Sequence, residues 1–135
     1  MKIKRIEQRK RSKGDCGVAC VAMVLDQKYE LIETIFHQHQ LVDENGDYYT
    51  FHKDLIGVIE EFGVTASRKM FKSWSKVETP AIVKINVRKG NFWHWVVLDE
   101  IDGEKVMYDP KPGLPDQIRS FKGKRGSGQY LKINL

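Results

Sequence analysis

The chain has 135 residues, of which 41% are hydrophobic and 30% are charged. This length is enough for one compact domain with a hydrophobic core and too short for two domains of ordinary size. No repeat or low-complexity segment is present, which excludes a disordered or repeat protein. We therefore expect a single domain over residues 1–135.

The formal net charge is +5, and the basic excess is concentrated in residues 1–13 and 122–125. Short runs of like charge are usually solvated, so residues 1–13 are interpreted as a basic, solvated N-terminal segment. A surface for an acidic partner or a membrane is the alternative interpretation. We do not expect nucleic-acid binding, because the sequence has no basic stripe interleaved with aromatic residues.

The sequence predicts a cytoplasmic protein without a membrane segment. The basic N-terminal segment lacks the apolar core of a secretory signal, and no stretch approaches the ~18 consecutive apolar residues of a membrane helix. Cys16 and Cys20 would lie one turn apart in a helix, a geometry that disfavours a disulfide. Reduced thiols fit a reducing compartment.

A buried helix is predicted at residues 18–25, where the sequence VACVAMVL is apolar on all sides. Its start is well marked. Gly14 permits a turn, and Asp15 is expected to cap the free backbone amides. Cys16 then falls in the first helical turn.

Two further helices are predicted in the first half of the chain. Apolar residues recur at helical spacing from Leu31 to His39, and residues 43–47 (DENGD) form a loop. Thr50 is expected to cap a third helix, whose apolar stripe runs through residues 51–62 and which Gly63 ends.

After residue 63 the hydrophobic pattern changes from helical to extended. Asp102-Gly103 predicts a tight hairpin turn between two antiparallel strands. The predicted strands are residues 64–71, 81–87, 92–101, 105–108, 117–121 and 129–133. Helices followed by strands indicate an α+β domain, in which the buried helix packs on a C-terminal antiparallel β-sheet.

Cys16 is the candidate nucleophile. A thiol attacks as the thiolate, which a helix N-terminus and a neighbouring imidazolium both favour. Gly17 is expected to leave the helix start uncrowded, so that a substrate carbonyl can approach the thiol and the nearby backbone amides. Cys20 lies within the apolar helix and is interpreted as a small core residue.

His94 is the candidate general base. It lies in the strand sequence FWHWVVL, where alternation places His94 and Val96 on one face and Trp93 and Trp95 on the other. A partly desolvated imidazole of fixed orientation suits proton transfer. A purely structural core histidine is the alternative. The other three histidines have polar neighbours and are interpreted as surface residues: His37, His39 and His52.

Asp109 follows His94 by fifteen residues, at the end of the strand after the Asp102-Gly103 turn. Antiparallel pairing folds this strand back, so that its carboxylate can reach the imidazole ring and hold its tautomer. Considered alone, Asp109 would be a routine strand-end residue. Together with Cys16 and His94 it completes a Cys-His-Asp set.

Other candidate sites have weaker support. Cys-x-x-x-Cys lacks a second pair of closely spaced ligands, so no metal is expected. Residues 123–128 (GKRGSG) do not match a phosphate-binding loop and are interpreted as a flexible basic loop. The tryptophans Trp74, Trp93 and Trp95 are expected mainly in the core, with a substrate groove as the alternative.

These motifs resemble the bacteriocin-processing peptidases, which cleave leader peptides after paired glycines and are often fused to peptide-exporting transporters. The resemblance rests on DCGVACVAMVL from Asp15, TPAIVKI from Thr79 and HWVVLDEIDGEKVMYDP from His94, and it spans residues 8–110. It implies a papain-like fold, with Cys16 as nucleophile, His94 as base and acid, and Asp109 as the group that orients the imidazole. It also implies an acyl-enzyme mechanism without a metal or organic cofactor.

The sequence departs from the family pattern at the oxyanion hole. The family places a glutamine six residues before the cysteine, where this chain has Lys10. Gln8 lies two residues further upstream, and a longer loop would bring its amide to the site. Gln8 is therefore the candidate oxyanion donor beside the backbone amide of Cys16.

The resulting hypothesis is a cysteine peptidase that hydrolyses a peptide bond in a peptide or protein substrate. A double-glycine leader is not assumed as the substrate, because the sequence has no membrane segment or nucleotide-binding motif. Glutamine deamidation or acyl transfer by the same residues is one alternative. A catalytically inactive peptide-binding module is another, and the Lys10 departure mildly favours it.

Overall fold

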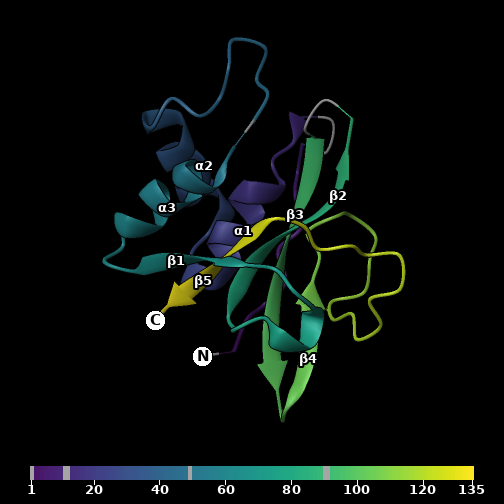
Figure 1. Cartoon of the computed structure of the whole chain (residues 1–135). Helices are drawn as coiled ribbons and strands as arrows, with labels where there is room; N and C mark the ends of the chain where they lie inside the picture. Colours follow the sequence, from purple (N-terminus) through teal and green to yellow (C-terminus); the bar gives the residue numbers. More distant parts are fainter. Residues whose placement is uncertain (1, 11–12, 49, 90–91) are drawn as a thin grey trace.

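The structure is a computed structural model that describes residues 2–10, 13–48, 50–89 and 92–135. Within these residues the helices precede the strands, which confirms the predicted α+β order (Figure 1). The α-helices are α1 (Cys16–Leu25), α2 (Tyr29–Gln38) and α3 (His52–Glu60). The strands are β1 (Thr65–Met70), β2 (Ala81–Arg88), β3 (Phe92–Ile101), β4 (Glu104–Tyr108) and β5 (Gln129–Asn134), and a short 3₁₀ turn spans Trp74–Lys76.

The strands form one antiparallel sheet in the order β1-β5-β2-β3-β4. The C-terminal strand β5 is therefore inserted between β1 and β2, so that the first and last strands of the chain are neighbours in the sheet. The predicted strand at residues 117–121 is wrong as a regular element. Within this segment only Ile118 pairs with β4, as an isolated bridge in which it exchanges two backbone hydrogen bonds with Met107.

Helix α1 lies between the other two helices and the sheet (Figure 1), where it contacts both. Every residue from Cys16 to Val24 is buried, as the all-round apolar pattern predicts. A second apolar cluster covers the opposite face of the sheet, where Val83 and Val96 pack with the aromatic side chains of Phe71 and Trp74. The sheet is thus covered on both faces.

The N-terminal segment is not a solvated tail. Ile3 is only 3% exposed and belongs to the main core, and Gln8 is also buried. The prediction of a solvated segment is wrong because the apolar side chains between the basic residues, Ile3 and Ile6, pack against the domain. The neighbouring Lys2 and Lys4 remain exposed. The segment therefore contributes to the fold and to the site described below.

Two helix starts differ from the sequence prediction. Helix α2 begins at Tyr29, which is buried, whereas Leu31 is 44% exposed. At α3 the expected Thr50 cap is wrong: the Asp54 carboxylate accepts a hydrogen bond from the backbone N–H of Phe51 at 2.8 Å. Thr50 is buried instead against α1.

Candidate active site

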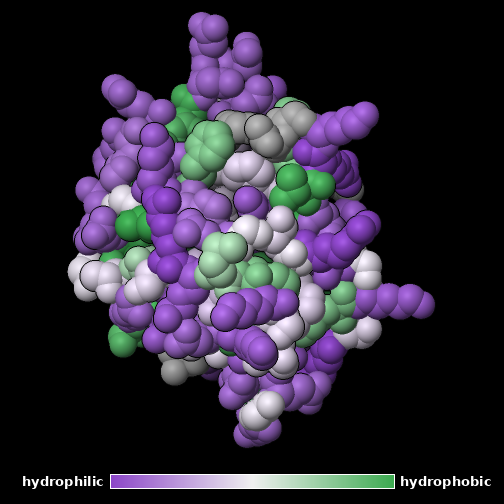
Figure 2. Space-filling model, viewed as in Figure 1, coloured by the Kyte–Doolittle hydropathy of each residue, from purple (hydrophilic) through white to green (hydrophobic). Residues whose placement is uncertain are grey.

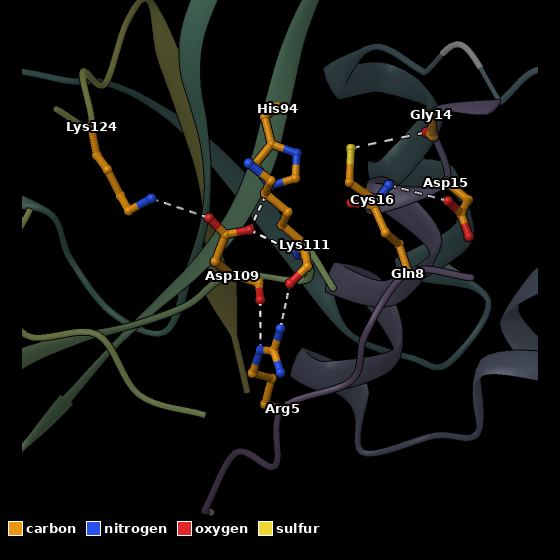
Figure 3. Close-up of polar contacts among 9 residues, drawn as sticks. All are labelled: Arg5, Gln8, Gly14, Asp15, Cys16, His94, Asp109, Lys111 and Lys124. Carbon is orange, nitrogen blue, oxygen red and sulfur yellow. Dashed lines mark hydrogen bonds and ion pairs between the residues drawn. The ribbon is translucent and has the colours of Figure 1, made fainter. Parts of the chain in front are cut away.

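The start of α1, strand β3 and the end of β4 bring Cys16, His94 and Asp109 to one place (Figure 3). His94 pairs with Ile85 across β2 and β3, and the β3-β4 hairpin returns the chain to Asp109. The Nε2 atom of His94 lies 2.6 Å from Oδ1 of Asp109. Because the carboxylate engages Nε2, Nδ1 is the ring nitrogen left for the thiol.

The charges of this pair are mutually stabilised. Burial alone would lower the pKa of His94, but its hydrogen bonds with Asp109 and Cys16 raise this pKa to about 9. Burial would raise the pKa of Asp109, but the imidazole hydrogen bond and charge lower it to about 2. The imidazolium and the carboxylate therefore coexist at neutral pH.

The sulfur of Cys16 faces the imidazole of His94 (Figure 3). Both residues line a cavity of about 320 Å³. Cys16 is 5% exposed and lines both this cavity and a second hollow. This second hollow is smaller and more apolar, and Thr50, Trp93 and Trp95 are among its lining residues. The thiol thus lies where a bound carbonyl could meet it.

Gln8 lies at the same cavity, as its proposed role requires. Its Nε2 donates a hydrogen bond to Oδ1 of Asp15 at 3.4 Å, and its backbone N–H donates to the carbonyl of Pro110 at 2.8 Å. The amide group therefore sits beside Cys16 despite the offset of two residues from Lys10 (Figure 3).

Asp15 does not cap α1 as expected, because its side chain makes no hydrogen bond to the amides of that helix. Its buried carboxylate instead accepts hydrogen bonds from the backbone N–H groups of Arg9 and Lys10, at 2.8 and 2.9 Å, and from the Tyr29 hydroxyl. This carboxylate folds the longer loop that brings Gln8 to the site.

Comparison with protein families supplies the classification. The model of the Peptidase C39 family matches residues 3–116. The chain belongs to the Peptidase C39 family. A search of curated proteins finds no match.

Two solved structures share the fold. One is a double-glycine-motif protease from an AMS/PCAT transporter in complex with its leader peptide: TM-score 0.68, 23% identity, covering 98% of this chain and 91% of that one. The other is the peptidase domain of Streptococcus ComA, a bifunctional ABC transporter of a quorum-sensing pathway: TM-score 0.72, 16% identity, covering 98% of each chain. They confirm the papain-like fold and the resemblance to the bacteriocin-processing peptidases.

The N-terminal segment of this C39 chain clamps the backbone that follows the carboxylate. The Arg5 guanidinium donates hydrogen bonds to the carbonyls of Asp109, at 2.7 Å, and Lys111. Glu7 accepts a hydrogen bond from the backbone N–H of Gly113 at 3.0 Å. Sequence reasoning missed these contacts, because they join segments more than 100 residues apart.

Lys124 was also missed. Its Nζ atom lies 3.4 Å from Oδ2 of Asp109, on the side of the carboxylate away from His94 (Figure 3). The interpretation of residues 123–128 as a flexible basic loop is wrong, because Trp74 donates a hydrogen bond to the Lys124 carbonyl at 3.2 Å and Gly126 pairs with Ile85. No regular periodicity marks this segment in the sequence.

Other predicted residues divide between core and site. Cys20 is fully buried, and burial raises the pKa of its thiol well above the ordinary value. His52 is not a simple surface residue: its Nε2 atom lies 2.7 Å from the Gln129 carbonyl, and its ring packs edge-on against Trp95. Burial lowers the pKa of His52. Trp95 is buried as expected, whereas the partly exposed Trp93 lines both hollows beside Cys16.

In residues 2–10, 13–48, 50–89 and 92–135, no helix is long and apolar enough to cross a membrane. The same ranges contain no group of three histidine, cysteine, aspartate or glutamate side chains that could hold a metal ion.

Proposed function

We propose that the chain is a cysteine peptidase in which Cys16 is the nucleophile, His94 the general base and acid, and Asp109 the group that orients the imidazole. The observation that carries this proposal is the 2.6 Å contact between His94 and the buried Asp109 carboxylate, beside the only thiol that lines the described cavity. Membership of the Peptidase C39 family supports it independently.

The proposed reaction begins from a thiolate–imidazolium pair, in which the proton of Cys16 already resides on Nδ1 of His94, and the thiolate attacks the substrate carbonyl carbon. The backbone N–H of Cys16 and Nε2–H of Gln8 would stabilise the resulting oxyanion. As the C–N bond breaks, the imidazolium gives its proton to the leaving amine. Water then attacks the thioester while His94 takes the water proton, the C–S bond breaks, and the carboxyl product leaves Cys16 as the thiolate beside the imidazolium.

A peptide is the proposed substrate, since one structural relative is a protease in complex with a leader peptide. The cavity beside Cys16 is lined by the N-terminal segment and the start of α1 on one side and by β2 and β3 on the other, and we propose that the peptide binds between them. We expect the protein to act in the cytoplasm and to need no metal or organic cofactor.

The direct test is the rate of Cys16 alkylation by iodoacetamide as a function of pH. We expect rapid alkylation at pH 7 in the wild type and in Cys20→Ala, because buried Cys20 does not react. In His94→Ala the rate at pH 7 should fall at least ~10-fold, since the imidazolium no longer stabilises the thiolate. Equal rates with and without His94 would leave a peptide-binding module as the better account.

A further inference from the structure

The cavity beside Cys16 adjoins a second, shallower hollow of about 540 Å³. Asn86 and Arg88 at the end of β2 line both, so the two form one groove that leads from the thiol towards residues 123–127. Figure 2 shows hydrophilic side chains interspersed with hydrophobic patches on the face in view, with strongly hydrophilic side chains projecting along its right-hand edge. Polar and charged residues of the second hollow, among them Arg88, Arg125 and Ser127, would therefore face a substrate that extends beyond the reacting atoms.

The charged side chains that line this groove are mostly basic. Its basic lining residues are Arg88, Lys111, Lys124 and Arg125. Among the described residues, Asp109 is the one acidic lining residue, and its carboxylate is already engaged by His94 and Lys124. None of the ion pairs between described residues includes Arg88 or Arg125.

The backbone that carries Arg125 is fixed to the wall of the groove. Asn86 has a left-handed φ of 53°, within an irregularity of the β2-β3 pairing. Its backbone N–H donates to the Arg125 carbonyl, and its side-chain oxygen accepts from the Arg125 backbone N–H, both at 2.9 Å. Gly126 packs so closely on Phe71 that a Cβ atom would lie 2.4 Å from the ring. The groove thus presents Arg125 from an ordered position.

Guanidinium groups bind carboxylates through paired, charge-assisted hydrogen bonds. We propose that Arg88 and Arg125 form a subsite for an acidic side chain of the peptide substrate, on the side of the scissile bond that faces the tip of β2. This inference rests on the proposed peptidase function, because it names the class of substrate that the same site takes.

The first test measures the electrostatic potential of the groove near Cys16 in the absence of a substrate, in the Cys20→Ala background. The probes are iodoacetate, which is anionic, and iodoacetamide, which is neutral, and the readout is the ratio of their rates at Cys16. At low salt Arg125→Glu should lower this ratio on the order of threefold, and Arg88→Glu similarly, through loss of a nearby positive charge. Lys122→Glu is the matched control, since it changes the net charge equally but lines neither hollow.

The second test compares quenched fluorescent peptides that carry Glu or Gln at each of four positions on either side of the cleaved bond. We expect kcat/KM to be at least about fivefold higher for Glu at one position on one side. This preference should disappear in the Arg88→Glu/Arg125→Glu variant and persist in Lys122→Glu. Circular dichroism and thermal unfolding confirm that each variant is folded.

The outcomes separate the subsite from the proposed function. Equal rates for Glu and Gln peptides at every position, or an alkylation ratio that Arg125→Glu and Lys122→Glu change equally, would overturn the acidic subsite. Failure to cleave any peptide, together with alkylation that does not depend on His94, would overturn the peptidase proposal. In that case the alkylation ratio still decides whether Arg88 and Arg125 create an anion-attracting groove.

Discussion

The two oxygens of the Asp109 carboxylate have separate donors. Oδ1 faces the imidazole of His94 and also accepts the backbone N–H of Lys111 at 2.9 Å, whereas Oδ2 lies near the Lys124 ammonium. A carboxylate held on both sides cannot rotate without losing one set of contacts. The geometry therefore fixes the direction in which the imidazole points, and with it the nitrogen that faces Cys16.

Lys124→Met should raise the pKa of Asp109, because the ammonium is one of the charges that lower it. The change is measured by following the ¹³C chemical shift of the Asp109 carboxyl as the pH is lowered. Lys122→Met, in the same loop but without a contact to Asp109 among the described residues, is the control. An unchanged Asp109 titration would mean that Lys124 exerts no electrostatic influence on the carboxylate.

Gln8→Ala should reduce kcat by about 10²–10³-fold, the usual cost of removing one oxyanion donor. Substrate affinity should change much less, because the hydrogen bond strengthens only as negative charge develops on the carbonyl oxygen. Single-turnover kinetics separate the two effects. Gln38→Ala, at an exposed position of α2, is the control, and a Gln8→Ala enzyme with normal kcat would remove Gln8 from the oxyanion hole.

At the scale of elements, α1 packs closely because Gly17 has no side chain. A Cβ atom at Gly17 would lie 3.0 Å from Oγ1 of Thr50 and 3.3 Å from a methyl group of Leu55. The expectation that Gly17 leaves open space for a substrate is therefore wrong. The space that a side chain would take is occupied by Thr50, Leu55 and Trp95, so the first turn of α1 packs directly against α3 and β3.

Gly17→Ala should destabilise the domain despite the better helix propensity of alanine. The gain of about 0.5–1 kcal/mol from propensity is smaller than the overpacking cost of about 1–3 kcal/mol. Urea unfolding measures the difference. Gly57→Ala in α3 is the matched control, because its nearest neighbour is the His39 ring at 3.7 Å, and it should stabilise by up to ~1 kcal/mol. Greater stability of Gly17→Ala would contradict this account.

The regular elements could be predicted from the sequence, and so could the positions of the candidate site residues that lie on them, such as His94. Alternation along residues 92–101 places His94 correctly relative to its neighbours, and the turn at Asp102-Gly103 returns the chain so that Asp109 meets the imidazole. Contacts between irregular segments could not be predicted in this way. The bonds of Asp15 to the loop before it, and of Lys124 to Asp109, depend on chain paths that no periodicity encodes.

At the scale of the whole molecule, the buried charges of the site couple stability to pH. The pKa of His94 is raised from 6.5 to about 9, so its contribution is complete below pH 6.5 and is lost as the pH rises through 9. The pKa of Asp109 is lowered from 3.8 to about 2, so its contribution is complete above pH 3.8 and is lost as the pH falls through 2. Both contributions are complete only between these limits, at about pH 4 to 6.5.

The stability difference between the wild type and His94→Ala should therefore be largest at pH 4–6.5 and should shrink as the pH approaches 10, where the wild type has lost its imidazolium. Thermal unfolding of both proteins at a series of pH values from 4 to 10 measures this difference. Val96→Ala is the control: it removes buried apolar contacts from the same strand, so its cost should not vary with pH in this way. If the stability difference between the wild type and His94→Ala also did not vary with pH, the imidazole would contribute to the fold through packing alone. The charge pair that the proposed mechanism needs would then be absent from the resting protein.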